Sequence, residues 1–130
     1  MDNPRTRVLY VEDEPDIADL IRFILGRQGF EVLGASSGEE ALHLIERFMP
    51  DIILLDLMMP DMDGWNVYQL MKANPDTCHI PVIVVTSKVR SVDKMLALDV
   101  AGVQGYIAKP FHPATLISSI HDVLVKDVEQ

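Results

Sequence analysis

An apolar run that ends in a carboxylate constrains this chain more than any other feature. The run 52–55 contains four consecutive Ile and Leu side chains and leads directly into Asp56. Turn-forming residues follow at Pro60 and Gly64. An apolar run without alternation, bounded by turn residues, is typical of a strand buried on both faces of a parallel sheet. Ligand sites in such sheets lie beyond the carboxyl ends of the strands, so Asp56 is a candidate site residue.

The rest of the chain alternates between short apolar runs and amphipathic segments. The runs predict strands at residues 7–11, 30–35, 52–55, 81–85 and 106–108. The segments predict helices that begin near residues 15, 37, 65, 91 and 113. Strands that alternate with helices are expected to be parallel and joined by right-handed crossovers. We therefore predict an α/β fold, a doubly wound five-stranded parallel sheet of order 2-1-3-4-5 that is flavodoxin-like, with helices on both faces.

Helical periodicity also predicts which side chains face the core. Apolar residues that recur three and four positions apart form the inner stripe of each helix. The side chains predicted to face inward include Leu20 in the first helix, Leu70 in the third, and Val92, Met95 and Leu96 in the fourth.

Length and composition limit the class of protein. The 130 residues suit one domain with a core over about residues 6–126, and no output domain is expected after the last helix. Hydrophobic residues make up 48% and no apolar run is long enough for a spanning helix, which argues against a membrane protein. Cys78 is the only cysteine, so a cytoplasmic location is expected. The net charge of −9 disfavours binding to nucleic acid or anionic membranes and favours a protein partner or a metal.

Polar side chains follow four of the five predicted strands. They are Glu12 and Asp13 after the first, Asp56 after the third, Thr86 after the fourth and Lys109 after the fifth. The predicted strand order brings these strand ends together. Three carboxylates and one ammonium sum to −3 + 1 = −2, which a divalent cation would balance. Because the ligands are all oxygen atoms, Mg²⁺ is the expected ion.

Such a group of residues suits phosphoryl transfer. A carboxylate such as Asp56 can attack phosphorus and hold an aspartyl phosphate. The approaching phosphoryl group is also anionic, so the site needs positive charge and fixed donors. A Mg²⁺ ion, Lys109 and the Thr86 hydroxyl can supply them.

Four motifs together resemble one protein family. They are the stretches Tyr-Val-Glu-Asp-Glu at 10–14, Leu-Asp-Leu-Met-Met-Pro-Asp-Met-Asp-Gly at 55–64, Val-Thr-Ser at 85–87 and Tyr-Ile-Ala-Lys-Pro-Phe at 106–111. The chain is similar, from end to end, to the receiver domains of two-component response regulators.

The resemblance implies a chemical role for several residues. Asp56 would accept a phosphoryl group from a histidine kinase or a phosphotransfer protein. Mg²⁺ would be held by Asp13, Asp56 and the backbone carbonyl of Met58, with Glu12 reaching it through water. The peptide bond between Lys109 and Pro110 would be cis.

The resemblance also implies a two-state signalling switch. Thr86 would move toward the phosphoryl group and Tyr106 would rotate into the space that it leaves. The face formed by the fourth helix, the fifth strand and the fifth helix would change, and a downstream protein or a second copy of the chain would bind it. Met58 and Lys88 stand where receivers tune the lifetime of the phosphate. The chain would act as a signalling protein that catalyses only its own phosphorylation and dephosphorylation.

Three other functions remain open. A phosphohydrolase with an aspartate nucleophile would use the same sheet edge, but such enzymes place an acid two residues after the nucleophile, where this chain has Met58. A flavin- or nucleotide-binding module would need a phosphate-binding loop after the first strand, where acids and Pro15 stand instead. A receiver-like module that binds partners without phosphorylation usually lacks some of the acidic or lysine positions, all of which are present.

Overall fold

The computed structural model describes residues 5–59, 63–87 and 90–129. Lys88, predicted to tune the phosphate lifetime, and the predicted turn residue Pro60 lie outside these ranges. The side chain of Val92, predicted to face inward, is not among the described side chains.

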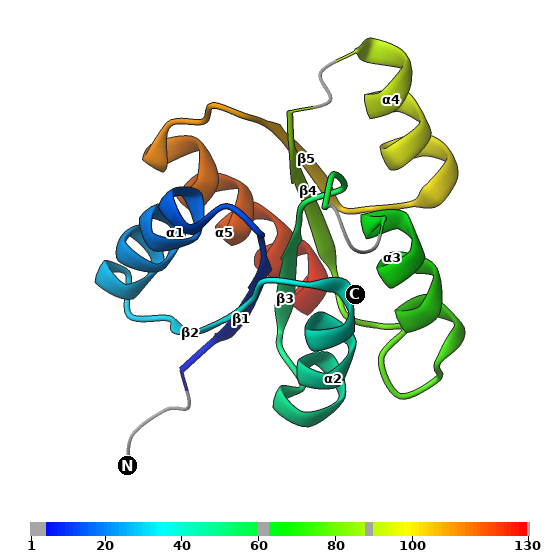
Figure 1. The fold of residues 1–130 in the computed structure, drawn as a ribbon, viewed down its shortest axis with the longest axis horizontal. Coiled ribbons are helices and arrows are strands. Elements are labelled where there is room, and N and C mark those ends of the chain that lie inside the picture. Colours follow the sequence, from blue (N-terminus) through cyan, green and yellow to red (C-terminus); the bar gives the residue numbers. More distant parts are fainter. Residues whose placement is uncertain (1–4, 60–62, 88–89, 130) are drawn as a thin grey trace.

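The described residues form the predicted alternation of strands and helices (Figure 1). The strands are β1 (Arg7–Val11), β2 (Glu31–Ala35), β3 (Ile52–Leu55), β4 (Val82–Thr86) and β5 (Gly105–Ala108). The helices are α1 (Pro15–Arg27), α2 (Gly38–Phe48), α3 (Gly64–Ala73), α4 (Ser91–Met95), its π-helical continuation η1 (Leu96–Ala101) and α5 (Pro113–Glu129). All strand pairs are parallel and the order is β2-β1-β3-β4-β5, which confirms the predicted topology.

Helices cover both faces of the sheet, so the strands can be apolar on both sides. In Figure 1, α1 and α5 lie on one side, and α2 and α3 lie on the other. The first face packs Ile24 of α1 and Ile120 of α5 against Leu54 of the central strand. The second face packs Ile45 of α2 and Val67 of α3 against the same strand and its neighbours. This double cover explains the unalternating apolar run that precedes Asp56.

Local signals at the helix ends match the prediction. Pro15 occupies the first turn of α1, where its missing N–H has no cost. The Ser37 hydroxyl accepts a hydrogen bond from the backbone N–H of Glu40 at 3.1 Å and so caps α2. The Glu40 carboxylate accepts in turn from the backbone N–H of Ser36 at 2.7 Å. The peptide bond between Lys109 and Pro110 is cis, as the resemblance implies.

Four side chains predicted to face inward are exposed, and these predictions were wrong. Leu20 of α1 and Leu70 of α3 are 42% and 53% exposed, because the residue that follows each of them, Ile21 or Met71, is buried on the face that packs on the sheet. Met95 and Leu96 are 51% and 47% exposed, and Ala97 is buried in their place. The change from α to π geometry after Met95 alters the number of residues in each turn, so an α-helical period does not predict the inner face of this segment.

The helices that the structure describes are too short or too polar to cross a bilayer.

Candidate functional site

Two carboxylates meet at the carboxyl edge of the sheet because β1 and β3 are neighbours. The backbone N–H of Asp56 donates to the carbonyl of Val11 at 3.1 Å, and that of Glu12 donates to the carbonyl of Ala35 at 2.9 Å. These bonds extend the strand pairing by one residue and hold both acidic residues at the edge. The side chains of Glu12 and Asp56 are nonetheless buried, with 3% and 4% of each residue exposed. Burial of two like charges requires a cation nearby.

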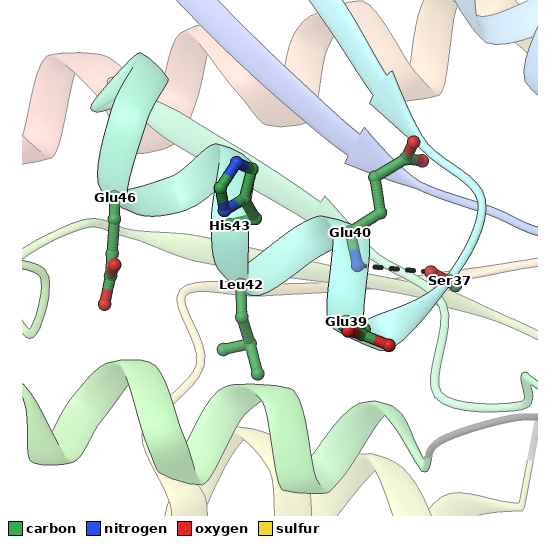
Figure 2. Close-up of a pocket in the computed structure, with 6 residues that line it drawn as sticks. All are labelled: Ser37, Glu39, Glu40, Leu42, His43 and Glu46. Atoms are coloured by element: carbon green, nitrogen blue, oxygen red, sulfur yellow. Dashed lines mark hydrogen bonds between the residues drawn. The ribbon is translucent and has the colours of Figure 1, made fainter.

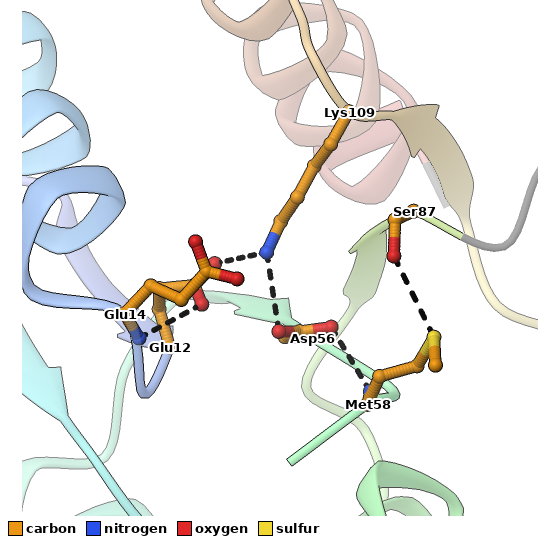
Figure 3. Close-up of polar contacts among 6 residues, drawn as sticks. All are labelled: Glu12, Glu14, Asp56, Met58, Ser87 and Lys109. Carbon is orange, nitrogen blue, oxygen red and sulfur yellow. Dashed lines mark hydrogen bonds and ion pairs between the residues drawn. The ribbon is translucent and has the colours of Figure 1, made fainter.

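Lys109 supplies a cation to both carboxylates. Its Nζ atom lies 3.1 Å from Oδ2 of Asp56 and also contacts Oε1 of Glu12 (Figure 3). The backbone N–H of Lys109 donates to the carbonyl of Thr86 at 2.9 Å, which ties the residue to the end of β4. A backbone hydrogen bond therefore fixes the position of Lys109, and two carboxylates fix its ammonium group.

Burial and ion pairing act on the pKa values of Glu12 and Lys109 in opposite directions. Burial raises the pKa of Glu12, and the hydrogen bonds from Lys109 and from the backbone N–H of Glu14 offset only part of that effect. Burial alone would lower the pKa of Lys109, but the hydrogen bond to Glu12 and the charges of Asp56 and Glu12 outweigh it, so the pKa of Lys109 is raised. The direct contact with Glu12 favours the ionised form of both groups.

The loop after β3 orients the other oxygen of Asp56. The backbone N–H of Met58 donates to Oδ1 of Asp56 at 3.0 Å. The Met58 side chain turns toward solvent and its sulfur accepts from the Ser87 hydroxyl at 3.5 Å (Figure 3). Gly64, at the start of α3, approaches the same backbone: a Cβ atom there would lie 2.4 Å from the carbonyl oxygen of Asp56. Helix α3 can therefore begin this close to the site only with glycine.

A hard cation fits the acidic residues. Glu12, Asp13 and Asp56 each offer a carboxylate oxygen, and these atoms lie within 4.8 Å of one another. Asp13 is half-buried and the other two are buried. The donors are all oxygen, and their charge exceeds that of Lys109 by two, which suits Mg²⁺.

The structure places Thr86 and Tyr106 near this edge without testing their roles. Thr86 is the last residue of β4, is fully buried, and pairs with Ala108 of β5. Tyr106 lies two residues before Ala108 in β5, pairs with Val84 of β4, and is half-buried. Burial and the charge of Asp93 raise the pKa of Tyr106. Their parts in a switch, and the ligand role of the Met58 carbonyl, remain predictions.

Two contacts at the site were not predicted. The resemblance implies that Glu12 reaches the metal through water, and it does not predict the ion pair with Lys109 that the structure shows. The Ser87–Met58 contact joins the loops after β3 and β4 across the site. Neither contact has a sequence signal, because each joins residues from different loops.

A model of one family matches most of the chain. The family is described as the response regulator receiver domain, and the match covers residues 8–121. The chain belongs to this family. The acidic pocket of Glu12, Asp13 and Asp56 thus lies within the matched part of a receiver domain.

Curated relatives agree with this assignment. The DNA-binding response regulator MtrA of Mycolicibacterium smegmatis is 32% identical over 130 residues, which cover 100% of this chain and 55% of the relative. The sensory transduction protein RegX3 of the same species is 40% identical over 119 residues, which cover 92% of this chain and 50% of the relative. The receiver chain thus spans about half the length of these relatives.

Solved receiver structures share the fold. The receiver domain of a LuxO repressor from Vibrio parahaemolyticus is similar with a TM-score of 0.86 and 31% identity, over 95% of this chain and 93% of that one. A CheY-like receiver domain protein from Methanospirillum hungatei has a TM-score of 0.85 and 30% identity, over 97% of this chain and 98% of that one.

Proposed function

We propose that this receiver accepts a phosphoryl group on Asp56 from a histidine kinase or a phosphotransfer protein, in a Mg²⁺-dependent reaction. The observation that carries the proposal is the arrangement around one buried carboxylate. Asp56 contacts Lys109 through one oxygen and the Met58 N–H through the other, with two further carboxylates in metal-binding range. An aspartate that only ended a strand would not need this set of neighbours.

Each neighbour has a task in the transfer. An oxygen of Asp56 forms the new P–O bond while the P–N bond to the donor imidazole breaks, and the electron pair of that bond stays on the imidazole. The Met58 N–H and the Lys109 ammonium orient the carboxylate before the reaction. Lys109 then offers its charge to a phosphoryl oxygen, and the Thr86 hydroxyl donates to another. Mg²⁺ would be held by Asp13, Asp56 and the backbone carbonyl of Met58, with Glu12 reaching it through water, and would supply positive charge against the incoming oxygens.

Phosphorylation is proposed to change the face formed by α4, β5 and α5. Thr86 ends β4 and Lys109 directly follows β5, and both strands lead to this face. A phosphoryl group that favours the closest approach of Thr86 and Lys109 would therefore favour one state of the face. Tyr106 is proposed to rotate inward into the space that Thr86 leaves, since it is only half-buried and can gain burial. A downstream protein target would bind the changed face, or a second copy would bind it as a homodimer. We propose that residues 1–130 form a single receiver domain and that this domain acts in the cytoplasm.

The proposal is tested by measuring the intact mass after incubation with Mg²⁺ and acetyl phosphate. We expect the wild type to gain the mass of one HPO₃ group, and to gain none with EDTA. Asp56→Asn should remain unmodified, whereas Asp122→Asn, which alters an exposed acid on α5, should react like the wild type. An adduct that persists in Asp56→Asn, or no adduct on the wild type, would contradict the proposal.

Two alternatives give different results in the same assay. A phosphohydrolase would turn over a phosphate ester continuously, yet the residue two after Asp56 is Met58, which has no acid to protonate a leaving group. An interaction module that works without phosphorylation would gain no mass at all. Binding of the downstream partner by both the free and the phosphorylated forms with equal affinity would favour that module.

A further inference from the structure

Helices α2 and α3 lie on the side of the sheet opposite α1 and α5 (Figure 1). A groove runs along α2 and between these two helices. It consists of three adjoining hollows of about 650, 250 and 460 Å³. Glu46 lines all three, Leu42 lines the first two, and Asn74 and Thr77 line the last two. These shared residues make the hollows one surface, which we call the α2–α3 groove.

Apolar side chains line the middle of the α2–α3 groove, where α2 faces α3. Figure 2 shows Leu42 pointing from α2 toward the neighbouring helix. Leu70 faces the groove from α3 with half of its surface exposed, and Met49 is exposed at the far end. The sequence predicted that Leu70 would be buried, but the described residues leave 53% of it exposed. Apolar side chains gathered in a groove are a common mark of a binding surface.

The rim of the groove is acidic. Glu39 and Glu46 of α2 and Asp76 of the loop after α3 line it. Among the described residues that line these hollows, none is Lys or Arg. Lys72 of α3 is not among the lining residues. Its ammonium donates to the carbonyls of Cys78 and Ile80, at 2.8 and 3.1 Å.

Internal hydrogen bonds hold both ends of the groove in shape. At one end the Ser37 hydroxyl caps α2. At the other end the Thr77 hydroxyl donates to the carbonyl of Met71 at 2.6 Å, and the N–H of Asp76 donates to Oδ1 of Asn74 at 2.9 Å. A preformed surface loses little conformational freedom on binding.

We infer that the α2–α3 groove is a docking surface for a basic amphipathic helix of a partner protein. Its apolar stripe would cover Leu42 and Leu70, and its Lys and Arg side chains would meet Glu39, Glu46 and Asp76. Helix α2 has 11 residues, so the groove is roughly 16 Å long and would accept about three turns of helix. A second copy of this chain is disfavoured here, since it would bring its own acidic groove and a net charge of −9.

The inference does not depend on phosphorylation of Asp56, and its test uses the unphosphorylated full chain. The probe is a fluorescein-labelled peptide of about 14 residues, roughly four helical turns, with Leu at i, i+3, i+4 and i+7 and Lys at the flanking positions. A peptide of the same composition in scrambled order keeps the charge but loses the apolar stripe. Fluorescence anisotropy gives Kd, and ¹⁵N–¹H spectra with unlabelled peptide locate the bound residues.

Charge and apolar contacts are separated by variants. Glu46→Lys should weaken binding of the patterned peptide about tenfold, because Glu46 lines the whole groove. Leu70→Ala should also weaken peptide binding, because it removes an apolar contact. Alanine favours the helical conformation, so this substitution should leave α3 intact. Asp122→Lys on α5 changes the net charge of the protein by the same amount as Glu46→Lys and should leave Kd within about twofold of the wild type. Thermal unfolding of each variant confirms that it is folded.

Shifts confined to α2, α3 and residues 74–77, with the expected ranking of variants, would support the inference. Equal affinity for the scrambled peptide, or equal weakening by Asp122→Lys, would overturn it in favour of general attraction to an acidic protein. Shifts on the α4, β5 and α5 face would also overturn it, as would no saturable binding. A concentration-dependent dimer that Glu46→Lys abolishes would assign the groove to a second copy instead.

Discussion

Lys109 contacts two buried carboxylates at once, so its removal affects both the charge balance and the chemistry of the site. Without its ammonium group, Glu12 and Asp56 would have no ion-pair partner among the residues that the structure describes. Neither could leave the edge easily, because backbone hydrogen bonds fix both residues to neighbouring strands.

We expect Lys109→Ala to slow phosphorylation of Asp56 by roughly 100-fold, a typical loss for one electrostatic donor. The rate is measured as the gain in intact mass over time with Mg²⁺ and acetyl phosphate. Lys126→Ala, on the exposed surface of α5, is the matched control. A Lys109→Ala rate equal to that of Lys126→Ala would show that this ammonium takes no part in the transfer.

Asp13 is the site acid that has the most access to solvent, and it gives a test of metal binding that needs no phosphate. A ligand at ten times its Kd stabilises a folded protein by about 1.4 kcal/mol, or about 5 °C in Tm for a chain of this length. Mg²⁺ should raise the Tm of the wild type by this amount, and EDTA should reverse it. Asp13→Asn should lose the shift, and Asp16→Asn in α1 should keep it. A shift of equal size in both variants would place the ion elsewhere.

At the scale of elements, α3 connects the site to the rest of the second face. Its first residue, Gly64, lies against the backbone of Asp56 and Leu57, and its N–H donates to the carbonyl of Leu57 at 3.1 Å. At its middle, the Tyr68 hydroxyl donates to the carbonyl of Ala101 at 2.7 Å and joins α3 to the end of η1.

Gly64→Ala should destabilise the protein by roughly 1–3 kcal/mol and slow phosphorylation, since the added Cβ would displace the backbone that carries Asp56. Denaturant unfolding measures the first effect and the mass assay measures the second. Ala73→Gly, at the opposite end of α3, would perturb the helix without approaching the site. If Gly64→Ala were as stable and as reactive as the wild type, the close approach would have no consequence.

Tyr68 provides a pH test of the α3–η1 contact. Burial raises the pKa of Tyr68, so the folded protein holds the phenol proton more tightly than the unfolded chain does. Its contribution to stability is therefore complete below pH about 10 and is lost as the pH rises through the pKa of the folded state. Tyr68→Phe should lower the free energy of unfolding by about 1 kcal/mol at pH 7. The ordinary pKa of tyrosine is about 10, so the test compares roughly pH 9 with pH 11. Over this range the free energy of unfolding of Tyr68→Phe should fall less than that of the wild type. Parallel curves for the two proteins would show that Tyr68 does not titrate with unfolding.

At the scale of the whole molecule, the charge decides which partners can approach. The net charge of −9 repels the phosphates of nucleic acids. The relative MtrA is described as DNA-binding, but this chain spans only 55% of it.

We therefore expect this 130-residue chain to show no saturable binding to duplex DNA at physiological salt, with or without phosphorylation. Fluorescence anisotropy of a labelled duplex measures this directly, and a basic DNA-binding protein serves as the positive control. Saturable binding by the free chain would contradict the charge argument.

The sequence by itself determined the topology and the edge of the sheet at which three candidate site residues meet. An unalternating run such as 52–55 can be buried only between two helical layers, and alternating strands and helices leave few ways to connect them. Because parallel strands end at one edge, Glu12, Asp56 and Lys109 could be placed together from their positions after strands.

Only the tertiary structure decided how these groups pair and which apolar side chains stay uncovered. Whether Glu12 faces a metal or Lys109 depends on side-chain distances that no local pattern encodes. The exposure of Leu70 and Leu96 depends on how α3 lies on the sheet and on the π turn after Met95. Periodicity describes one helix, whereas burial requires a neighbouring element, and for that reason the α2–α3 groove could be found only in the folded chain.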